Sequence, residues 1–152
     1  MKLEIENRKT TTNAGLSDLA ELVQSLSDCM KPDLWNFVCT HTFKVKVRSD
    51  NGLYTNDIYY NEWYLDTGRW VYVDGHLKLM AETSERYEDE ELHDPEYINS
   101  CDFVSSIYKI DFKEAISTLE KIVTQYNTLA VKKDEEISRF LQLCNEFRGG
   151  EL

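Results

Sequence analysis

A histidine, a glutamate and a tyrosine are the residues whose types and predicted positions could do acid–base chemistry. The strand pairing that the turns predict places His41 opposite Glu62, and Glu62 opposite Tyr72, on the apolar face of a sheet. Titratable groups buried together have shifted pKa values, and such groups occur at catalytic and ligand-binding sites. They also occur as hydrogen-bonded structural pairs. The three residues are therefore a candidate polar cluster, and a small enzyme using His41 and Glu62 is one hypothesis.

Cations and aromatic rings share the opposite face of the same predicted sheet. The members of this basic and aromatic face are Lys44, Lys46, Arg48, Tyr59, Trp63 and Lys78. Rings that stack on bases, beside cations that neutralise phosphates, are typical of single-stranded nucleic acid binding. Lysines and aromatic residues are also common on the solvated face of an antiparallel sheet. The face therefore predicts either a site for a nucleotide or other small anion, or an ordinary solvated surface.

The largest concentration of charge lies after the last predicted strand, in residues 82–102. Nine acidic side chains and one basic side chain give this stretch −8 of the formal net charge of −11. A run of like charge is most often a solvated loop, but Tyr87, Leu92 and Tyr97 distinguish this one from a purely solvating tail. We expect its carboxylates to bind a basic, nucleic-acid-binding protein. The residues expected to make this contact are Glu85, Glu88, Asp89, Glu90, Glu91, Asp94 and Glu96.

Motifs for catalysis, metals or cofactors are absent from the sequence. It contains no G-x-S-x-G, no phosphate-binding glycine loop and no H-E-x-x-H. The four cysteines are widely spaced, without a C-x-x-C pair, and no EF-hand order of ligands occurs. We therefore expect reduced thiols, no metal, no cofactor and no enzymatic activity.

Composition narrows the class of protein further. A length of 152 residues with 41% hydrophobic and 12% aromatic residues is typical of one folded domain, 1–152. A pI near 4.7 disfavours direct nucleic-acid binding, because cationic side chains drive phosphate binding. No signal-peptide core and no apolar run of about 18 residues is present. We expect no membrane association and a cytoplasmic location, which is the host cytosol if a phage encodes the chain.

Two apolar stripes predict helices at the ends of the domain. Residues 1–15 are polar and are expected to form a flexible lead-in, followed by a helix at 16–31 that Pro32 ends. A second helical segment, 111–148, begins at a capping-box-like Asp111. It is one long helix or two helices with a break near 127–133. One helix is favoured because no glycine or proline interrupts it.

The stripe of the C-terminal segment has coiled-coil-like heptad spacing. Apolar residues recur at intervals of three and four from Ile116 to Phe147, with Lys133 as the exception. A single helix of this length overhangs one sheet at about 1.5 Å per residue. The overhang predicts a homodimer through the C-terminal helix.

Between the helices, an apolar period of two predicts an antiparallel meander at 39–82. Two-residue turns are expected at Asn51-Gly52 and Asp74-Gly75. A three-residue loop at 66–68, with Gly68 in the left-handed region, is expected between the middle strands, because it brings the apolar residues onto one face. The expected pairs are Val45 with Ile58, Phe43 with Tyr60, Lys46 with Asp57, Tyr72 with Leu77 and Trp70 with Leu79. The expected strands are 39–48, 54–65, 69–73 and 76–82, with a further strand at 103–110 after the acidic segment, 83–102.

The expected fold class is α+β, with an N-terminal helix, a four- to five-stranded antiparallel meander sheet, and a long C-terminal helix or helical hairpin. The expected function is that of a non-enzymatic acidic binding protein that occupies the basic nucleic-acid-binding site of a target. Phage inhibitors of the anti-CRISPR or anti-restriction type and immunity proteins work in this way, an analogy of size and charge alone. The alternatives are a module that sequesters a nucleotide or other small anion, and the small enzyme.

Overall fold

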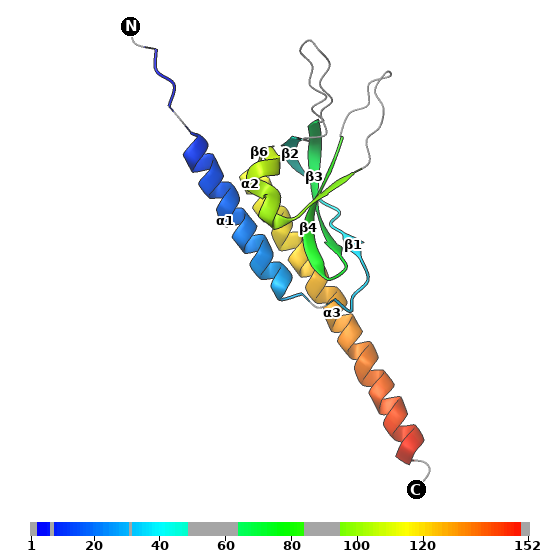
Figure 1. Ribbon diagram of the computed structural model, residues 1–152. Coiled ribbons are helices and arrows are strands. Elements are labelled where there is room, and N and C mark those ends of the chain that lie inside the picture. Colours follow the sequence, from blue (N-terminus) through cyan, green and yellow to red (C-terminus); the bar gives the residue numbers. More distant parts are fainter. Residues whose placement is uncertain (1–2, 7, 31, 49–63, 84–94, 150–152) are drawn as a thin grey trace, which may run out of the picture.

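The computed structural model describes residues 3–6, 8–30, 32–48, 64–83 and 95–149 (Figure 1). The predicted α+β class is confirmed, with an N-terminal helix, an antiparallel sheet and a long C-terminal helix. In chain order the elements are α1 (Lys9–Asp28), β1 (Phe37–Val38), β2 (Phe43–Arg48), β3 (Tyr64–Val73), β4 (His76–Glu82), β5 (Glu96–Ile98), the 3₁₀ turn η1 (Ser100–Asp102), α2 (Phe103–Ser106), β6 (Ile107–Ile110) and α3 (Phe112–Gly149).

The sheet has the strand order β5-β4-β3-β2-β6, and the short strand β1 also pairs with β3. The hairpin of β3 and β4 has the predicted register, with Trp70 opposite Leu79 and Tyr72 opposite Leu77. Its turn places Asp74 at φ 50° and Gly75 at φ 83°, the left-handed conformations that an Asp-Gly hairpin turn requires. The local turn chemistry therefore determines this part of the sheet.

The predicted loop at 66–68 is wrong, because these residues lie inside the continuous strand β3. Gly68 faces Phe43 on one side and Ala81 on the other. A Cβ atom on Gly68 would lie 2.7 Å from the Phe43 ring and 2.9 Å from Val45 Cγ1. The glycine therefore makes room for packing between β2 and β3 and does not form a turn.

The first predicted hairpin register is also wrong, because β2 pairs with residues 64–68 of β3. Phe43 faces Gly68 and Arg48 faces Tyr64, so Phe43, Val45 and Lys46 do not pair with residues 57–60. The other edge of β2 pairs with β6, where Val45 faces Ile110 and Lys46 faces Lys109. The predicted turn at Asn51-Gly52 and most of the predicted strand 54–65 lie outside the described residues.

Several element boundaries differ from the prediction. Helix α1 begins at Lys9, so residues 9–15 are helical and not a flexible lead-in. Residues 9–15 lack an apolar stripe that would predict a helix, and Gly15 lies close to the start of α3, since a Cβ atom there would lie 3.2 Å from the Phe112 ring. The predicted strand 39–48 is divided into β1 and β2, and only 107–110 of the predicted strand 103–110 is extended. The short strand β5 was not predicted.

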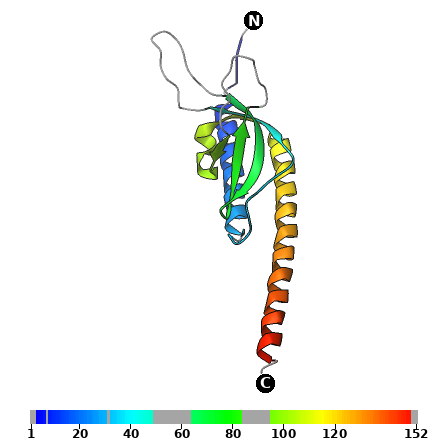
Figure 2. The ribbon, with the colours of Figure 1, turned by 90° about the vertical axis from the view of Figure 1, so that its right-hand side faces the viewer.

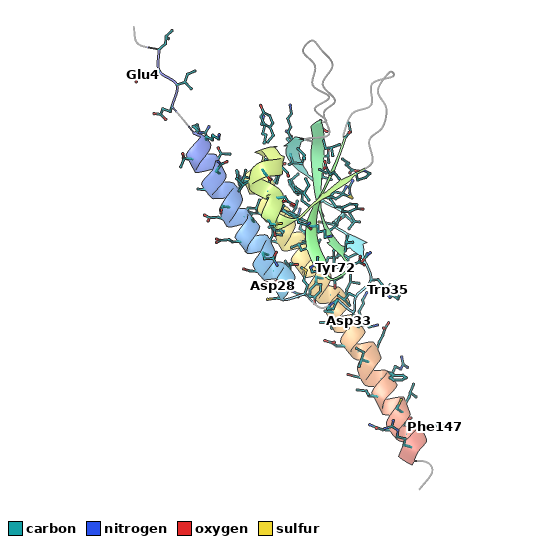
Figure 3. The ribbon with its side chains drawn as sticks, in the orientation of Figure 1. Glu4, Asp28, Asp33, Trp35, Tyr72 and Phe147 are labelled. Atoms are coloured by element: carbon teal, nitrogen blue, oxygen red, sulfur yellow. The ribbon has the colours of Figure 1, made fainter. Side chains whose placement is uncertain are left out.

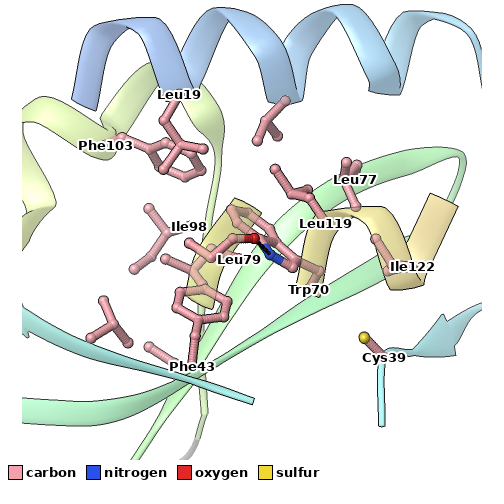
Figure 4. Close-up of a cluster of buried hydrophobic side chains, with 14 of the residues drawn as sticks. Leu19, Cys39, Phe43, Trp70, Leu77, Leu79, Ile98, Phe103, Leu119 and Ile122 are labelled. Carbon is pink, nitrogen blue, oxygen red and sulfur yellow. Dashed lines mark hydrogen bonds between the residues drawn. The ribbon is translucent and has the colours of Figure 1, made fainter. Parts of the chain in front are cut away.

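The hydrophobic core lies between one face of the sheet and the helices α1 and α3 (Figure 4). Trp70 lies at its centre, fully buried, with its ring stacked on Phe43 at 5.1 Å. The indole Nε1 of Trp70 donates to the Ala115 carbonyl and to Thr118 Oγ1, each at 3.0 Å. These bonds satisfy the buried N–H group and fix the position of α3 on the sheet. We call the opposite face of the sheet the outer sheet face.

Helix α3 is one continuous helix, as predicted, and it extends well past the rest of the protein (Figure 2). Asp111 caps it, because its Oδ1 accepts from the Glu114 amide at 3.0 Å. Its buried residues all lie between Ala115 and Tyr126. Within the described residues, no helix combines the length and the apolar composition needed to cross a bilayer.

Candidate functional site

Three exposed lysines gather on the outer sheet face where β2 and β6 are paired. In β2 the buried Phe43, Val45 and Val47 alternate with the exposed Lys44 and Lys46. Strand β6 contributes Lys109, which is exposed and directly faces Lys46. Because facing residues of an antiparallel pair have Cβ atoms about 4.5–5.5 Å apart, two like charges are held close together here.

These lysines line a groove of about 780 Å³, which we call the lysine groove. Its lining is formed by β2, β3, β6 and the first residues of α3, and comprises Lys44, Val45, Lys46, Asp66, Thr67, Lys109, Ile110, Asp111 and Phe112. The volume falls within the range of about 300–1,000 Å³ of ligand pockets in proteins. The groove therefore offers ammonium groups beside the partly exposed side chains of Phe112 and Ile110.

The backbone of the lysine groove is held in place by the first turn of α3. The Asp111 amide donates to the Lys44 carbonyl at 2.9 Å, and the Lys44 amide donates to Glu114 Oε2 at 3.1 Å. Asp111 also caps the helix, so its carboxylate is already engaged. Glu114 thus bonds to the neighbouring strand and does not close the predicted capping box. The backbone of Lys44 is therefore held by the start of α3, which is distant from β2 in the sequence.

The charge balance in the groove favours an anion at the lysines. Within the described residues, no carboxylate forms an ion pair with Lys44, Lys46 or Lys109. The acidic members of the lining are Asp66 and Asp111. By contrast, Arg69 on the same sheet face is neutralised by Glu82, with Nε and Oε1 3.0 Å apart. The lining thus combines three ammonium groups with two carboxylates, which leaves a formal charge of +1.

Among the remaining members of the predicted basic and aromatic face, Lys78 does not line the lysine groove. Lys78 is half-buried and faces Val71, whereas Lys44 faces Thr67. Four residues along β3 separate these two positions, or about 13 Å at about 3.3 Å per residue, so Lys78 does not join the groove. Arg48 is the last residue of β2, and Tyr59 and Trp63 lie outside the described residues. Lys109 was missed because the sequence did not predict that β6 pairs with β2.

The predicted polar cluster of His41, Glu62 and Tyr72 depended on the predicted loop at 66–68. These residues belong to strand β3, so the register that placed the three side chains together is wrong. Tyr72, labelled in Figure 3, lies on strand β3. It is fully buried in the core, where its ring stacks on Phe37 at 5.1 Å. Burial raises the pKa of Tyr72 above its ordinary value, and the neighbouring Tyr126 and Asp33 raise this pKa further. Glu62 lies outside the described residues.

His41 lies on the surface in a second, more open groove between the β1–β2 connection and α3. Its ring Nδ1 lies 3.2 Å from the Thr40 hydroxyl. The groove measures about 560 Å³ and is lined by Cys39, Thr40, His41, Ser117, Glu120, Lys121, Thr124 and Gln125. Tyr72 is not part of this lining. His41 and Tyr72 therefore face different environments and do not form an acid–base pair.

The acidic residues expected to bind a partner lie mostly outside the described residues. This holds for Glu85, Glu88, Asp89, Glu90, Glu91 and Asp94. Glu96 lies on β5 and is half-exposed, and the following Tyr97 is 54% exposed. In the described part of the sheet, β5 is an edge strand that pairs with β4.

Metal-binding groups do not gather in the described part of the chain, where no three histidine, cysteine or acidic residues could hold an ion together. The four cysteines are free thiols; Cys29 and Cys101 are exposed, Cys39 is buried, and Cys144 is half-buried on α3.

The chain matches no protein family model, no curated protein and no solved structure.

Proposed function

We propose that this chain is a non-enzymatic binding protein that holds a small anion, of the size and charge of a nucleotide phosphate, in the lysine groove. The facing pair of Lys46 and Lys109 carries the proposal. Like charges directly opposite each other in a sheet are destabilising, and a bound phosphate or carboxylate would remove this repulsion. A lysine ammonium is a common phosphate ligand, and three of them line the groove.

The size and the lining of the groove favour an organic anion over a simple inorganic one. A volume of about 780 Å³ exceeds what a single phosphate occupies. The partly exposed Phe112 and Ile110 supply apolar surface for a ring or chain that bears the charged group. The net charge of −11 opposes the binding of anions. Distant charges are screened, however, since the Debye length is about 8 Å at physiological ionic strength, so the adjacent lysines dominate.

The test is thermal unfolding in the presence of ADP and of inorganic pyrophosphate. We expect ADP to raise the Tm of the parent protein more than pyrophosphate does. At a ligand concentration 100 times the Kd, the stabilisation is about 2.7 kcal/mol. For a domain of this size it corresponds to a rise in Tm of roughly 5–10 °C.

Lys46→Gln and the matched control Lys132→Gln separate the groove from the total charge. Lys132 is exposed on the projecting part of α3, so both variants lose one positive charge, but only the first changes the groove. Lys46→Gln should abolish the ligand-induced rise in Tm and slightly raise the Tm of the ligand-free protein. An unchanged response of Lys46→Gln to ADP would refute the site. A lower ligand-free Tm of that variant would show that the facing lysines do not repel each other.

A second candidate function is the binding of a basic partner protein by the acidic segment. Two observations support this candidate. Residues 82–102 carry a net charge of −8, and on an edge strand Glu96 is half-exposed and Tyr97 is exposed. The target would be the basic nucleic-acid-binding site of another protein, as for a phage-encoded inhibitor. Replacing Glu88, Asp89, Glu90 and Glu91 with glutamine should leave stability within about 1 kcal/mol. The same change should slow association with the partner and weaken its salt dependence. Normal binding by this variant at low salt would exclude the candidate.

We place the protein in the cytoplasm as part of the proposal. Four free thiols, two of them exposed, are compatible with a reducing compartment.

A further inference from the structure

The C-terminal half of α3 presents exposed apolar side chains beyond Ala130, the last residue of the helix that packs against the core. After Tyr126 the helix has no buried residue, and it continues to Gly149. Figure 3 shows Phe147 near the far end of the helix, away from the sheet. The exposed apolar side chains of this half, which we call the projecting helix (130–149), are Val131, Ile137, Phe140, Leu141, Leu143 and Phe147.

Most of these residues lie on one face of the projecting helix. Ala130, Ile137, Phe140, Cys144 and Phe147 follow the heptad spacing, and Leu141 and Leu143 flank the stripe. In proteins, most of the stability of a helix comes from the packing of its amphipathic face and not from its intrinsic propensity. Contiguous exposed apolar surface of this kind marks an interaction site in soluble proteins. The projecting helix is therefore expected to be stabilised by a partner.

We propose that the projecting helix pairs with the same segment of a second copy of the chain, in an antiparallel two-helix coiled coil. A two-fold pairing buries the same stripe on both chains, so one sequence supplies both halves of the contact. The heptad spacing is the pattern by which helices recognise other helices. The proposal is independent of the lysine groove, which lies at the opposite end of α3.

The exposed phenylalanines supply a substantial part of the area of such a contact. Phe140 is 63% exposed and Phe147 is 75% exposed. If each ring offers about 200 Å², the four phenylalanines of two chains bring about 550 Å² of apolar surface into the contact. That is roughly a third of a standard interface of about 1,600 Å². The aliphatic residues of the stripe add to it on both chains.

Lys133 determines the direction of pairing. It occupies a core position of the heptad, so a parallel, in-register pair would place the two Lys133 ammonium groups against each other in the apolar seam. In the antiparallel arrangement, Ile137 packs against Phe140 of the second copy. Phe147 contacts the part of Ala130 of the second copy that the core leaves exposed. Lys133 then faces Cys144 of the second copy, and the two lysines lie apart.

The first experiment measures the oligomeric state of the full chain by sedimentation equilibrium at micromolar concentration. We expect a dimer, and we expect Phe140→Asp to be a monomer whose near-UV circular dichroism still reports the buried Trp70. The matched control is Gln142→Asp, which places the same charge on the opposite face of the helix and should remain dimeric. A monomeric parent, a trimer, or a Phe140→Asp variant that remains dimeric would overturn the proposal.

The second experiment tests the direction by disulfide formation, in a background that carries Cys29→Ser and Cys101→Ser. In a parallel pair the two Cys144 side chains face each other, so mild oxidation would link the chains. In the antiparallel pair they lie about 16 Å apart along the axis, too far for a disulfide. Adding Lys133→Cys should therefore create efficient linkage between chains. Positions 133 and 144 of one helix are too distant to link internally. Efficient linkage through Cys144 alone would refute the antiparallel arrangement.

Discussion

Replacing Gly68 with alanine tests the packing of the sheet most directly. The only described glycine with a positive φ is Gly75, so Gly68 has an ordinary backbone that alanine can adopt. The added methyl group would lie 2.7 and 2.8 Å from two atoms of the Phe43 ring and 2.9 Å from Val45 Cγ1. Phe43 cannot move freely, because it is 2% exposed and stacks on Trp70. Gly68→Ala therefore overpacks the core without straining the backbone.

Two opposing effects determine the magnitude. Overpacking a core costs about 1–3 kcal/mol. Replacing glycine with alanine gains about 0.4–1 kcal/mol through the less flexible unfolded chain. The net result is a loss of about 1–2 kcal/mol in the free energy of unfolding. For a chain of 152 residues, this loss lowers the Tm by roughly 2–8 °C.

A double-mutant cycle with Phe43→Leu, measured by urea unfolding, isolates the contact. Phe43→Leu destabilises the parent because it removes buried surface, but in the Gly68→Ala background it also relieves the clash. We therefore expect the double variant to be more stable than the sum of the two single effects predicts. Simple additivity, or a Gly68→Ala variant as stable as the parent, would show that residues 66–68 do not pack against β2.

Two further variants test the start of α3 and the buried tyrosine. Asp111→Ala should lower the free energy of unfolding by about 0.5–2 kcal/mol, because the Glu114 amide loses its cap. Asp111→Asn should lower the free energy of unfolding by less than Asp111→Ala does. Because it removes a negative charge, it should also strengthen the binding of ADP in the lysine groove. Equal losses of stability in the two variants would argue against the cap. For Tyr72, burial favours the neutral hydroxyl, so its pKa is higher in the folded state than in the unfolded state. The stability that this difference provides is present below about pH 10 and is lost as the pH rises through the folded pKa. The Tm of Tyr72→Phe should therefore fall less steeply with rising alkaline pH than that of the parent, and parallel profiles would contradict the assignment.

The parts of the fold that were predicted correctly depend on local signals. The hairpin of β3 and β4 follows from Asp74-Gly75, since few residue pairs adopt two consecutive left-handed conformations. The continuity of α3 follows from the absence of a helix-breaking residue, and Asp111 marks its start through a bond to the amide three residues later. Each of these signals acts within a few residues, so the sequence alone reveals it.

The parts that were predicted wrongly depend on contacts between distant residues. Residues 66–68 have the composition of a turn. The Phe43 and Val45 side chains that require a glycine at position 68 lie 25 and 23 positions earlier in the sequence. Strand β6 pairs with β2 across about 60 residues, and no local pattern indicates this neighbour. The two lysines of β2 were recognised as candidate ligands, whereas Lys109 was missed. The start of α1 was placed too late because residues 9–15 carry no apolar stripe, and the contact of Gly15 with Phe112 joins residues almost 100 positions apart.

The two proposals together constrain how the protein can act. The lysine groove includes Asp111 and Phe112 at the start of α3, whereas the proposed pairing uses its other end. In the antiparallel register given above, the two copies of Phe112 lie about 80 Å apart along the helix axis, at about 1.5 Å per residue. One small ligand cannot reach both grooves, and each groove is lined by residues of a single chain. The dimer should therefore bind one anion per chain at independent and equivalent sites. Phe140→Asp should accordingly leave the affinity for ADP unchanged, because it separates the chains without touching the lysines.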